Sequence, residues 1–244
     1  MTSKPSVRRP AARRRRAPRG SGELLRGEII AAARDCLNRL GSADAVSIRA
    51  VASHVGVTPP SIYLHFADKE ALLDAVLVDL FGELDEVMQQ AVAGVEQPLE
   101  RLRQQGLAYV RFARSSPEYY RLATMHVRTE AGNVDAILAT AAFTHFLATV
   151  SACMDEGIFA PGDPLPIALE LWAAAHGIAS LLVAKAYLPW GDPDLVADHV
   201  LRAAAIGHAV ADLIGDPDCA QFSAWLAAAQ GRPRSRRARP QPAG

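Results

Sequence analysis

The feature that most constrains the fold is a pair of short helical patterns separated by a single glycine, in the first third of the chain. Ser47 precedes apolar residues at helical spacing, a position at which its hydroxyl can cap the helix N-terminus. Gly56 follows that pattern, and glycine adopts without strain the left-handed conformation that ends many helices. Thr58 begins the second pattern, with Pro59 and Pro60 in its first turn, where a missing N–H costs no hydrogen bond. Together these signals predict a helix-turn-helix.

The second of these helices is predicted to divide its residues between a core and an exposed face. Because Pro60 has no N–H, we expect the Thr58 hydroxyl to accept from the amide of Ser61. Ile62 and Phe66 are four residues apart and should point into the core. The residues left to face outward are Ser61, Tyr63, Leu64 and His65. Two polar aromatic side chains on a short exposed helix favour contact with a DNA groove.

The remainder of the chain carries helical periodicity and no strand pattern, repeat or glycine-rich phosphate loop. Asp68 is expected to cap a long fourth helix with one apolar stripe: Leu72, Leu73, Val76, Leu80, Leu84 and Val87. The predicted helices span 23–40, 47–55, 58–66, 68–93, 99–113, 117–125, 133–157, 165–188, 194–214 and 222–229. The predicted fold class is therefore all-α, with nine to ten helices.

Charge is distributed unevenly although the net charge is zero. Residues 1–70 contain 13 Lys and Arg against 6 Asp and Glu, whereas residues 71–231 contain 8 against 20. A basic front and an acidic body indicate a nucleic-acid-binding module on a body that avoids DNA. The Arg-rich arm either enters a minor groove or contacts phosphates without specificity, and the sequence leaves both readings open.

The segment from Glu23 to about Val78 resembles the DNA-binding domain of the TetR/AcrR family of transcriptional regulators. The residues that carry the resemblance are Ile29–Ala33, Ser47–Ala52, Gly56–Thr58, Ile62–Phe66 and Asp68–Leu73. A generic helix-turn-helix is only moderately specific. The ending Tyr-x-x-Phe-x-x-Lys-Glu-x-Leu, joined directly to a long helix, is strongly specific.

The resemblance implies a recognition helix in the major groove and helix N-termini at phosphates. The implied DNA-contacting residues are Ser47, Thr58, Pro59, Pro60, Ser61, Tyr63, Leu64, His65 and Lys69. Unlike many relatives, the chain has no Lys, Arg, Asn or Gln between Thr58 and Phe66, so the common bidentate base contacts are missing from this helix. Base readout is expected to rest on apolar contacts, hydroxyl groups and DNA shape.

The resemblance also implies a homodimer on an inverted-repeat operator in double-stranded DNA. Its interface would be a four-helix bundle made by the eighth and ninth helices of both chains. The apolar residues expected to form it are Leu169, Leu181, Leu182, Val196, Val200, Ala203 and Val210.

Within the body, Leu171–Leu181 resembles the Trp-x-x-x-His-Gly segment of the WHG-type C-terminal subclass. Trp172 and His176 share a helix face, and Gly177 permits close approach of another helix. In relatives the body helices surround an effector cavity, which implies a ligand-binding set of Tyr109, Phe112, Met125, Phe143, Phe146, Trp172 and His176. These bulky residues suit a small, mostly apolar ligand, and a solid core made of the same side chains remains the alternative.

No residue pattern indicates an enzyme, a metal site or a cofactor. Cys36, Cys153 and Cys219 are far apart, and Cys36 lies on an apolar stripe with Leu25, Ile29, Ala33 and Leu40, so we expect a core residue rather than a redox sensor. Residues 136–154 are uncharged, but His145 and Thr149 are predicted on the side of the helix opposite its large apolar residues, which favours a bundle helix over a membrane span. Those apolar residues are Phe143, Phe146, Leu147, Val150 and Met154. No signal peptide is apparent, so a cytoplasmic setting is expected.

The predicted organisation is a disordered arm over 1–21, a DNA-binding domain over 22–67, a ligand-binding and dimerisation domain over 68–230 and a disordered tail over 231–244. The predicted function is a DNA-binding regulator, a repressor released by a small effector. The alternative is a DNA-architectural protein that binds through its basic tails without ligand control.

Overall fold

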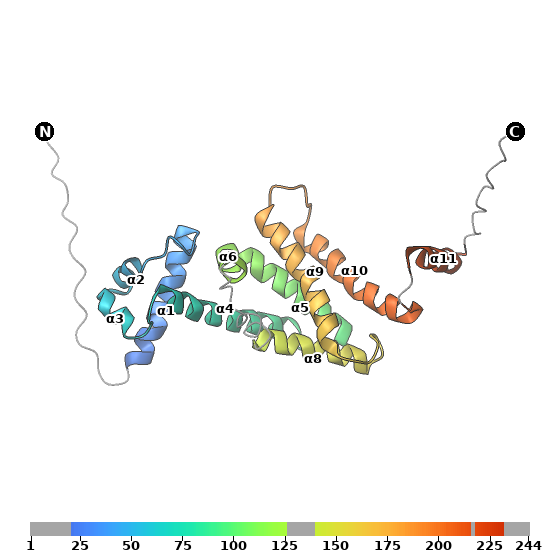
Figure 1. Ribbon diagram of the computed structural model, residues 1–244, viewed down its shortest axis with the longest axis horizontal. Helices are drawn as coiled ribbons and strands as arrows, with labels where there is room; N and C mark the ends of the chain where they lie inside the picture. Colours follow the sequence, from blue (N-terminus) through green and yellow to red (C-terminus); the bar gives the residue numbers. More distant parts are fainter. Residues whose placement is uncertain (1–20, 126–139, 216–217, 232–244) are drawn as a thin grey trace.

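The computed structural model describes residues 21–125, 140–215 and 218–231. Every regular element within these ranges is an α-helix, which confirms the predicted all-α class. The molecule is elongated: α1, α2 and α3 lie at one end, α4 leads from them into a helical body, and α11 lies at the opposite end (Figure 1).

The small N-terminal unit, called the head below, packs α1 (Ser21–Leu40), α2 (Ile48–Val55) and α3 (Pro59–Tyr63) around an apolar core. Ile29, Val51 and Ile62 are fully buried there. Cys36 is buried in the same core, as predicted. Leu40 is an exception to the predicted α1 stripe, because it is exposed at the last residue of the helix while Leu37 fills the core.

The turn between α2 and α3 has the expected backbone but a different cap. The Ala50 amide donates to the Ser47 Oγ at 3.2 Å, and Gly56 ends α2 with φ +79°, so both predictions are confirmed. The Thr58 hydroxyl does not cap α3: the Ser61 amide donates to the Thr58 carbonyl at 2.9 Å, and the hydroxyl pairs with Ser61 Oγ at 3.0 Å. The expected bond from Ser61 N–H to the Thr58 hydroxyl is therefore wrong.

The second helix of the motif is shorter than predicted. It ends at Tyr63, with Leu64 as its C-cap, whereas the apolar spacing suggested that it continues to Phe66. The amides of His65 and Phe66 both donate to the Ile62 carbonyl, at 2.9 and 3.0 Å. The chain tightens there and turns toward α4, and Phe66 still reaches the core.

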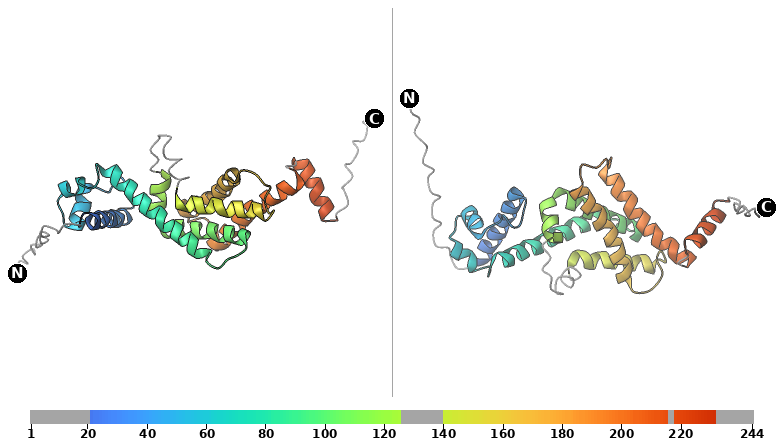
Figure 2. Two further views of the ribbon diagram at one scale, coloured as in Figure 1. Left: turned by 90° about the horizontal axis from the view of Figure 1, so that it is seen from below. Right: turned by 45° about the horizontal axis from the view of Figure 1, so that its top comes forward.

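Helix α4 (Lys69–Ala91) belongs to two cores at once. The Asp68 carboxylate caps it by accepting from the Ala71 amide at 2.7 Å. Its first half, including Leu72 and Leu80, packs in the head core, and its second half, including Leu84, packs in the body (Figure 2). Val87 was expected on the buried stripe but is 38% exposed, because the neighbouring Met88 occupies the inward position.

The body is assembled around α5 (Pro98–Ser115), which packs against α4, α8 (Ala141–Asp155), α9 (Pro164–Ala184) and α10 (Pro193–Ile214). α6 (Pro117–Met125) lies between the body and the head, and its Tyr119 is buried in the head core. Proline begins α5, α6, α9 and α10, consistent with its preference for the first helical position. Gly106 permits the close approach of α10, because a Cβ there would lie 3.0 Å from Leu201 Cδ1.

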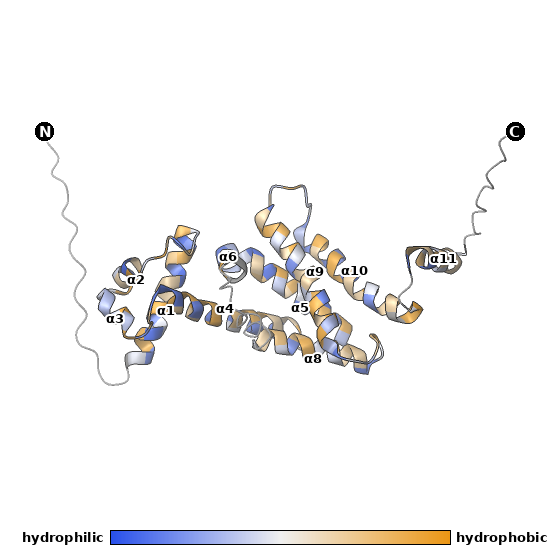
Figure 3. Ribbon diagram, in the orientation of Figure 1, coloured by the Kyte–Doolittle hydropathy of each residue, from blue (hydrophilic) through white to orange (hydrophobic). Residues whose placement is uncertain are grey.

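Helices α8 and α9 show how apolar segments are divided between core and surface. Phe143, Phe146 and Val150 of α8 are buried and His145 is exposed, as expected. Thr149 was predicted opposite the apolar side but is buried, and its hydroxyl is satisfied there by donating to the His145 carbonyl at 3.1 Å. α9 is long and apolar enough to cross a membrane by length and composition alone (Figure 3). It nevertheless packs against α5, α8 and α10, and one of its sides is exposed.

Helix α11 (Cys219–Ala229) stands apart from the bundle. It begins three residues before the predicted start, because Asp218 and Gln221 form a reciprocal capping box. None of its residues is buried.

Candidate nucleic-acid interface and body cavity

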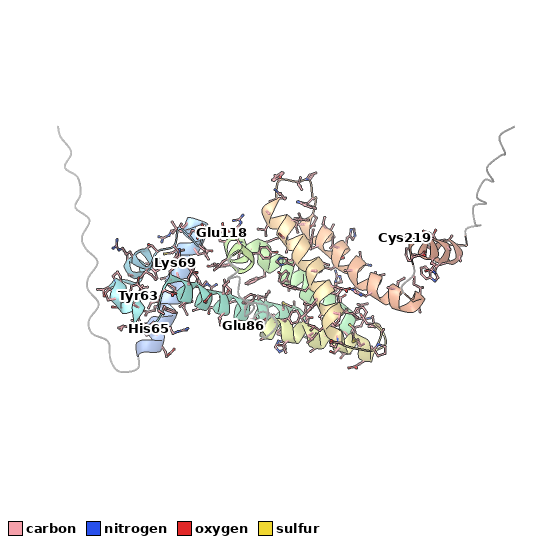
Figure 4. All side chains as sticks on the ribbon, viewed as in Figure 1. Tyr63, His65, Lys69, Glu86, Glu118 and Cys219 are labelled. Atoms are coloured by element: carbon pink, nitrogen blue, oxygen red, sulfur yellow. The ribbon has the colours of Figure 1, made fainter. Side chains whose placement is uncertain are left out.

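The exposed face of the helix-turn-helix contains every residue predicted to contact DNA, and none of them is buried. Leu64 is 85% exposed and Tyr63 is 53% exposed. Figure 4 shows Tyr63, His65 and Lys69 together at the end of the molecule that is farthest from α11. The structure therefore brings polar and aromatic side chains together at this end of the molecule.

The flanks of this surface are helix N-termini whose polar groups already have partners. The Ser47 hydroxyl caps α2, and the Lys69 Nζ donates to the Asp44 carbonyl at 3.1 Å. That bond fixes the first residue of α4 against the loop before α2. Each of these N-termini also carries the positive end of a helix dipole, which favours a phosphate.

The positive charge of the front of the chain does not lie in the folded head. Residues 21–70 carry five Lys and Arg against six Asp and Glu, whereas residues 1–20 carry eight Lys and Arg and no acid. Most of the positive charge at the front of the chain therefore belongs to residues 1–20, which lie outside the described residues.

The body contains a cavity of about 270 Å³ between α4, α5, α6, α8 and α9. Six of the residues predicted to surround a ligand line it: Tyr109, Phe112, Phe143, Phe146, Trp172 and His176. The seventh, Met125, is the last residue of α6, and its side chain is outside the described part of the chain. The body core is thus not solid, although the same side chains also form part of it.

Sequence reasoning missed the wall that α4 contributes. Leu77, Leu80, Phe81, Leu84 and Met88 line the cavity. Of these residues, the predicted apolar stripe contains only Leu80 and Leu84, and it assigns them to packing alone. Sequence reasoning also missed Gln105 of α5, which lies one turn before Tyr109 and so on the same helix face. The four-residue spacing between Gln105 and Tyr109 was the sequence signal that could have identified Gln105 as a lining residue.

A hydrogen-bonded cluster closes one side of the cavity. The Tyr109 hydroxyl lies 2.9 Å from His176 Nδ1, and the Tyr120 hydroxyl lies 3.2 Å from the same atom and donates to the His176 carbonyl at 3.1 Å. Burial lowers the pKa of His176 and raises the pKa of both tyrosines. All three groups are therefore uncharged near neutral pH.

The aromatic wall is built around Trp172. Its ring lies edge-on to Phe143 with centroids 6.4 Å apart and tilts toward His176 at 5.5 Å. Trp172 and His176 share a face of α9, as their spacing predicted. The predicted close approach at Gly177 is not made within the single chain, because Gly177 is exposed and no described atom lies within 4 Å of a Cβ placed there.

A short ion-pair network joins the head to the cavity wall. Arg34 of α1 donates to Glu83 of α4 at 2.7 Å and to Asp79 at 2.6 Å. The bond to Glu83 is the largest factor that raises the pKa of Arg34. Glu83 is one residue from Leu84, which lines the cavity, so these bonds tie α1 to the part of α4 that forms the cavity wall.

The described residues hold no group of three or more His, Cys, Asp or Glu placed to bind a metal ion. Cys36 and Cys153 are buried and Cys219 is exposed.

Comparisons with known proteins agree with this division into a head and a body. Residues 29–76 match the model for bacterial regulatory proteins of the tetR family, and residues 102–204 match a tetracyclin repressor-like C-terminal domain. The chain is 42% identical over 61 residues to the class A tetracycline repressor protein from transposon 1721 of Escherichia coli. That match covers 25% of this chain and 28% of the repressor.

Solved structures extend the similarity to both units. A protein of unknown function from Rhodococcus sp. RHA1 aligns with a TM-score of 0.63 and 30% identity over 76% of this chain and 95% of that one. A TetR-family transcriptional regulator from Pectobacterium atrosepticum aligns with a TM-score of 0.56 and 22% identity over 78% and 95% of the two chains. Assignment to the WHG-type subclass stays a prediction. The exposed recognition helix, the long shared α4 and these matches together establish that the chain belongs to the TetR family of DNA-binding transcriptional regulators.

Proposed function

We propose that the protein is a repressor that binds an inverted-repeat operator as a homodimer and is released by a small, mostly apolar effector. The observation that carries this proposal is the cavity of about 270 Å³ whose wall includes α4. The same helix begins at the DNA-facing surface and packs in the head core. A ligand in the cavity therefore acts on the element that positions the recognition helix.

The proposed coupling is a bias between two positions of α4. Leu77, Leu80 and Leu84 line the cavity, while Leu72 and Val76 on the same helix are fully buried in the head. A ligand that fits better when α4 is displaced favours that state by its difference in affinity. In a symmetric dimer the displacement changes the separation of the two heads, and operator affinity falls.

The dimer interface is proposed on the exposed sides of α9 and α10. One stripe of α9 comprises Leu169, Ala173, Gly177 and Leu181, all exposed. Gly177 lies at its centre, where a missing side chain permits a partner helix to approach. On α10 the exposed apolar residues include Leu195 at 61% and Ile206 at 50%, and exposed apolar patches of this kind mark association sites.

Three residues of the predicted interface pack against their own chain. Leu182 is buried in the body core, one position away from the exposed Leu181. Val196 and Val200 are half-buried against the same core. Leu195 and Ile206 extend the exposed apolar surface instead. Light scattering that gives only a monomer would remove the dimer from the proposal.

At the operator, Tyr63, Leu64 and the Ser61 hydroxyl are proposed to read bases, and Ser47 and Lys69 are proposed to bind phosphates. The exposure of Tyr63 and Leu64 supports direct contact. The arm supplies the charge that the head lacks, and deleting residues 1–20 should lower affinity for all DNA and flatten its salt dependence.

The test is to select bound fragments from the protein's own genome and measure their affinities with matched variants. Lys69→Ala should weaken all sequences about equally and reduce the salt slope by about one contact. Its control is Lys185→Ala, which removes one positive charge from the exposed end of α9. Tyr63→Ala should cost the operator about 1–3 kcal/mol, whereas Tyr187→Ala on the body should cost nothing. Unchanged operator affinity for Tyr63→Ala would show that α3 is not the helix that enters the groove.

Ligand control separates this proposal from a DNA-architectural role. Trp172→Ala is expected to change the response to small molecules and to leave unliganded operator affinity nearly intact. The cavity favours a ligand-controlled regulator over an architectural protein. A protein that only coats DNA needs no cavity beside α4, the helix that supports the DNA-binding head. We infer a cytoplasmic location, where operator DNA is accessible.

A further inference from the structure

Gln105 is a buried side chain whose amide has no partner. It is fully buried in the middle of α5, and neither Nε2 nor Oε1 has a hydrogen-bond partner among the described residues. A buried amide without partners is unfavourable, since folding removes its bonds to water. The adjacent Gln104 shows the usual arrangement, because its Nε2 donates to Glu100 Oε1 at 2.7 Å.

Gln105 is part of the cavity wall, so its amide is placed to contact a ligand. The residue lines the cavity one helical turn before Tyr109, on the same face of α5. The lining also includes apolar side chains, among them Leu84, Met88 and Phe143. The cavity therefore offers an amide donor and acceptor with no described partner together with hydrocarbon contacts.

The described lining also lacks formal charge. No carboxylate, ammonium or guanidinium group is among the described residues around the cavity. The His176 cluster is uncharged near neutral pH, because burial lowers the pKa of the imidazole. An ionised ligand would lose its hydration without gaining a charged partner, at a large cost in free energy.

The cavity volume limits the size of the ligand. A cavity of about 150 Å³ accommodates benzene, and this cavity measures about 270 Å³. It therefore accommodates a body of about two fused rings without expansion.

We propose that Gln105 determines effector specificity by pairing with an amide-like group on a neutral ligand of about two rings. The ligand N–H donates to Gln105 Oε1, its carbonyl oxygen accepts from Nε2, and its apolar body lies between α4 and α8. This inference rests on the proposed effector function and specifies the chemistry of the same cavity. A carboxamide or lactam presents the required donor and acceptor side by side.

The test uses three probes with one ring system: 2-naphthamide, naphthalene and 2-naphthoate. Their dissociation constants are measured by calorimetry on the full-length protein and on Gln105→Met, which keeps the length of the side chain and removes the amide. The control is Gln104→Met, the same change at a position outside the cavity. Gln105→Leu repeats the measurement if Gln105→Met aggregates.

The expected result is a preference of the unmodified protein for 2-naphthamide over both other probes. Gln105→Met should weaken 2-naphthamide at least about tenfold, the effect of losing one to two hydrogen bonds. Naphthalene affinity should be unchanged or improved, and Gln104→Met should alter neither. The unliganded Gln105→Met protein should also melt a few degrees higher, because an unpaired amide is replaced by an apolar group of similar shape.

Three results would overturn the inference: equal affinities for 2-naphthamide and naphthalene, equal affinities of the unmodified and Gln105→Met proteins for 2-naphthamide, or no binding of any probe. The first two would indicate that water alone satisfies Gln105. Failure of the proposed function gives a different result. In that case 2-naphthamide binds in a Gln105-dependent manner, but no selected DNA fragment is bound or released.

Discussion

The head and the body are both built from α-helices, but the head core is filled and the body core leaves a cavity. In the head, Ile29, Val51 and Ile62 are fully buried in one closed apolar core. In the body, the core splits into two clusters and leaves a cavity of about 270 Å³ beside a buried amide without a described partner. A close-packed interior transmits displacement as a unit, whereas a cavity leaves its walls free to adjust.

This difference supports the proposed division of roles, in which the head contacts DNA and the body binds an effector. A recognition helix must hold its side chains in fixed positions, and Ile62 and Phe66 anchor α3 for that purpose. A sensor needs a site that a ligand can complete, and unfilled volume provides it. Helix α4 packs in the head core with its first half and in the body core with its second half. The same substitution can therefore be compared at the two ends of one helix.

The largest expected effect comes from truncating the same residue type at the two ends of α4. Leu72→Ala should lower the free energy of unfolding by about 3–5 kcal/mol, because Leu72 is fully buried in the closed core. Leu84→Ala should cost only about 2–3 kcal/mol, because one side of Leu84 already faces the cavity. Urea unfolding measures both values. Equal costs would show that the two cores are packed alike.

The second prediction adds volume in place of removing it. Ala33→Leu should overpack the head core and destabilise the protein by about 1–3 kcal/mol. Ala175→Leu should stabilise it by about 0.5–2 kcal/mol, because Ala175 lines the cavity and the added methyl groups fill it. Thermal unfolding gives the sign of each change. If Ala175→Leu also destabilises the protein, the cavity wall cannot accept added volume and the comparison fails.

The third prediction concerns the contact between the two regions. Arg34→Met removes the bonds to Glu83 and Asp79 while keeping an apolar stem. Because these groups are partly exposed, we expect a stability loss of only about 1 kcal/mol. The larger consequence should be a weaker effect of ligand on operator affinity, measured by binding with and without effector. Arg121→Met removes only a local pair with Glu118 on α6 and should leave that response unchanged.

The smallest expected effect is a pH dependence at the cavity. Burial lowers the folded-state pKa of His176 below its usual value near 6.5. The unfolded chain therefore binds more protons between these two pKa values, and stability falls as pH drops from 7 through 6.5 toward the folded pKa. His176→Gln should reduce this loss, as measured by the difference between unfolding curves at pH 7.5 and 5.5. An identical pH dependence in both proteins would show that His176 is accessible to protons in the folded state.

Local sequence signals were sufficient to predict caps and turns, because these contacts are made between residues close together in the chain. Ser47, Gly56 and Asp68 act through neighbours within four residues, and each adopts the predicted role. Thr58 shows the limit even at short range, because two prolines and the Ser61 hydroxyl redirect its bond. Val87 and Thr149 were misplaced because adjacent positions on a helical wheel differ little, and the neighbouring helices decide which side chain is buried.

The sequence by itself determined the all-α class, the helix-turn-helix, the long α4 and the aromatic composition of the body, because periodicity, caps and turn residues act locally. Only the tertiary structure decided that α4 forms a wall of the cavity, that Leu182 faces inward while Leu181 faces outward, and that Gln105 is buried beside Tyr109 without a described partner. These properties depend on how helices distant in sequence approach one another. Residual volume is a property of the whole packing arrangement, and no single segment encodes it.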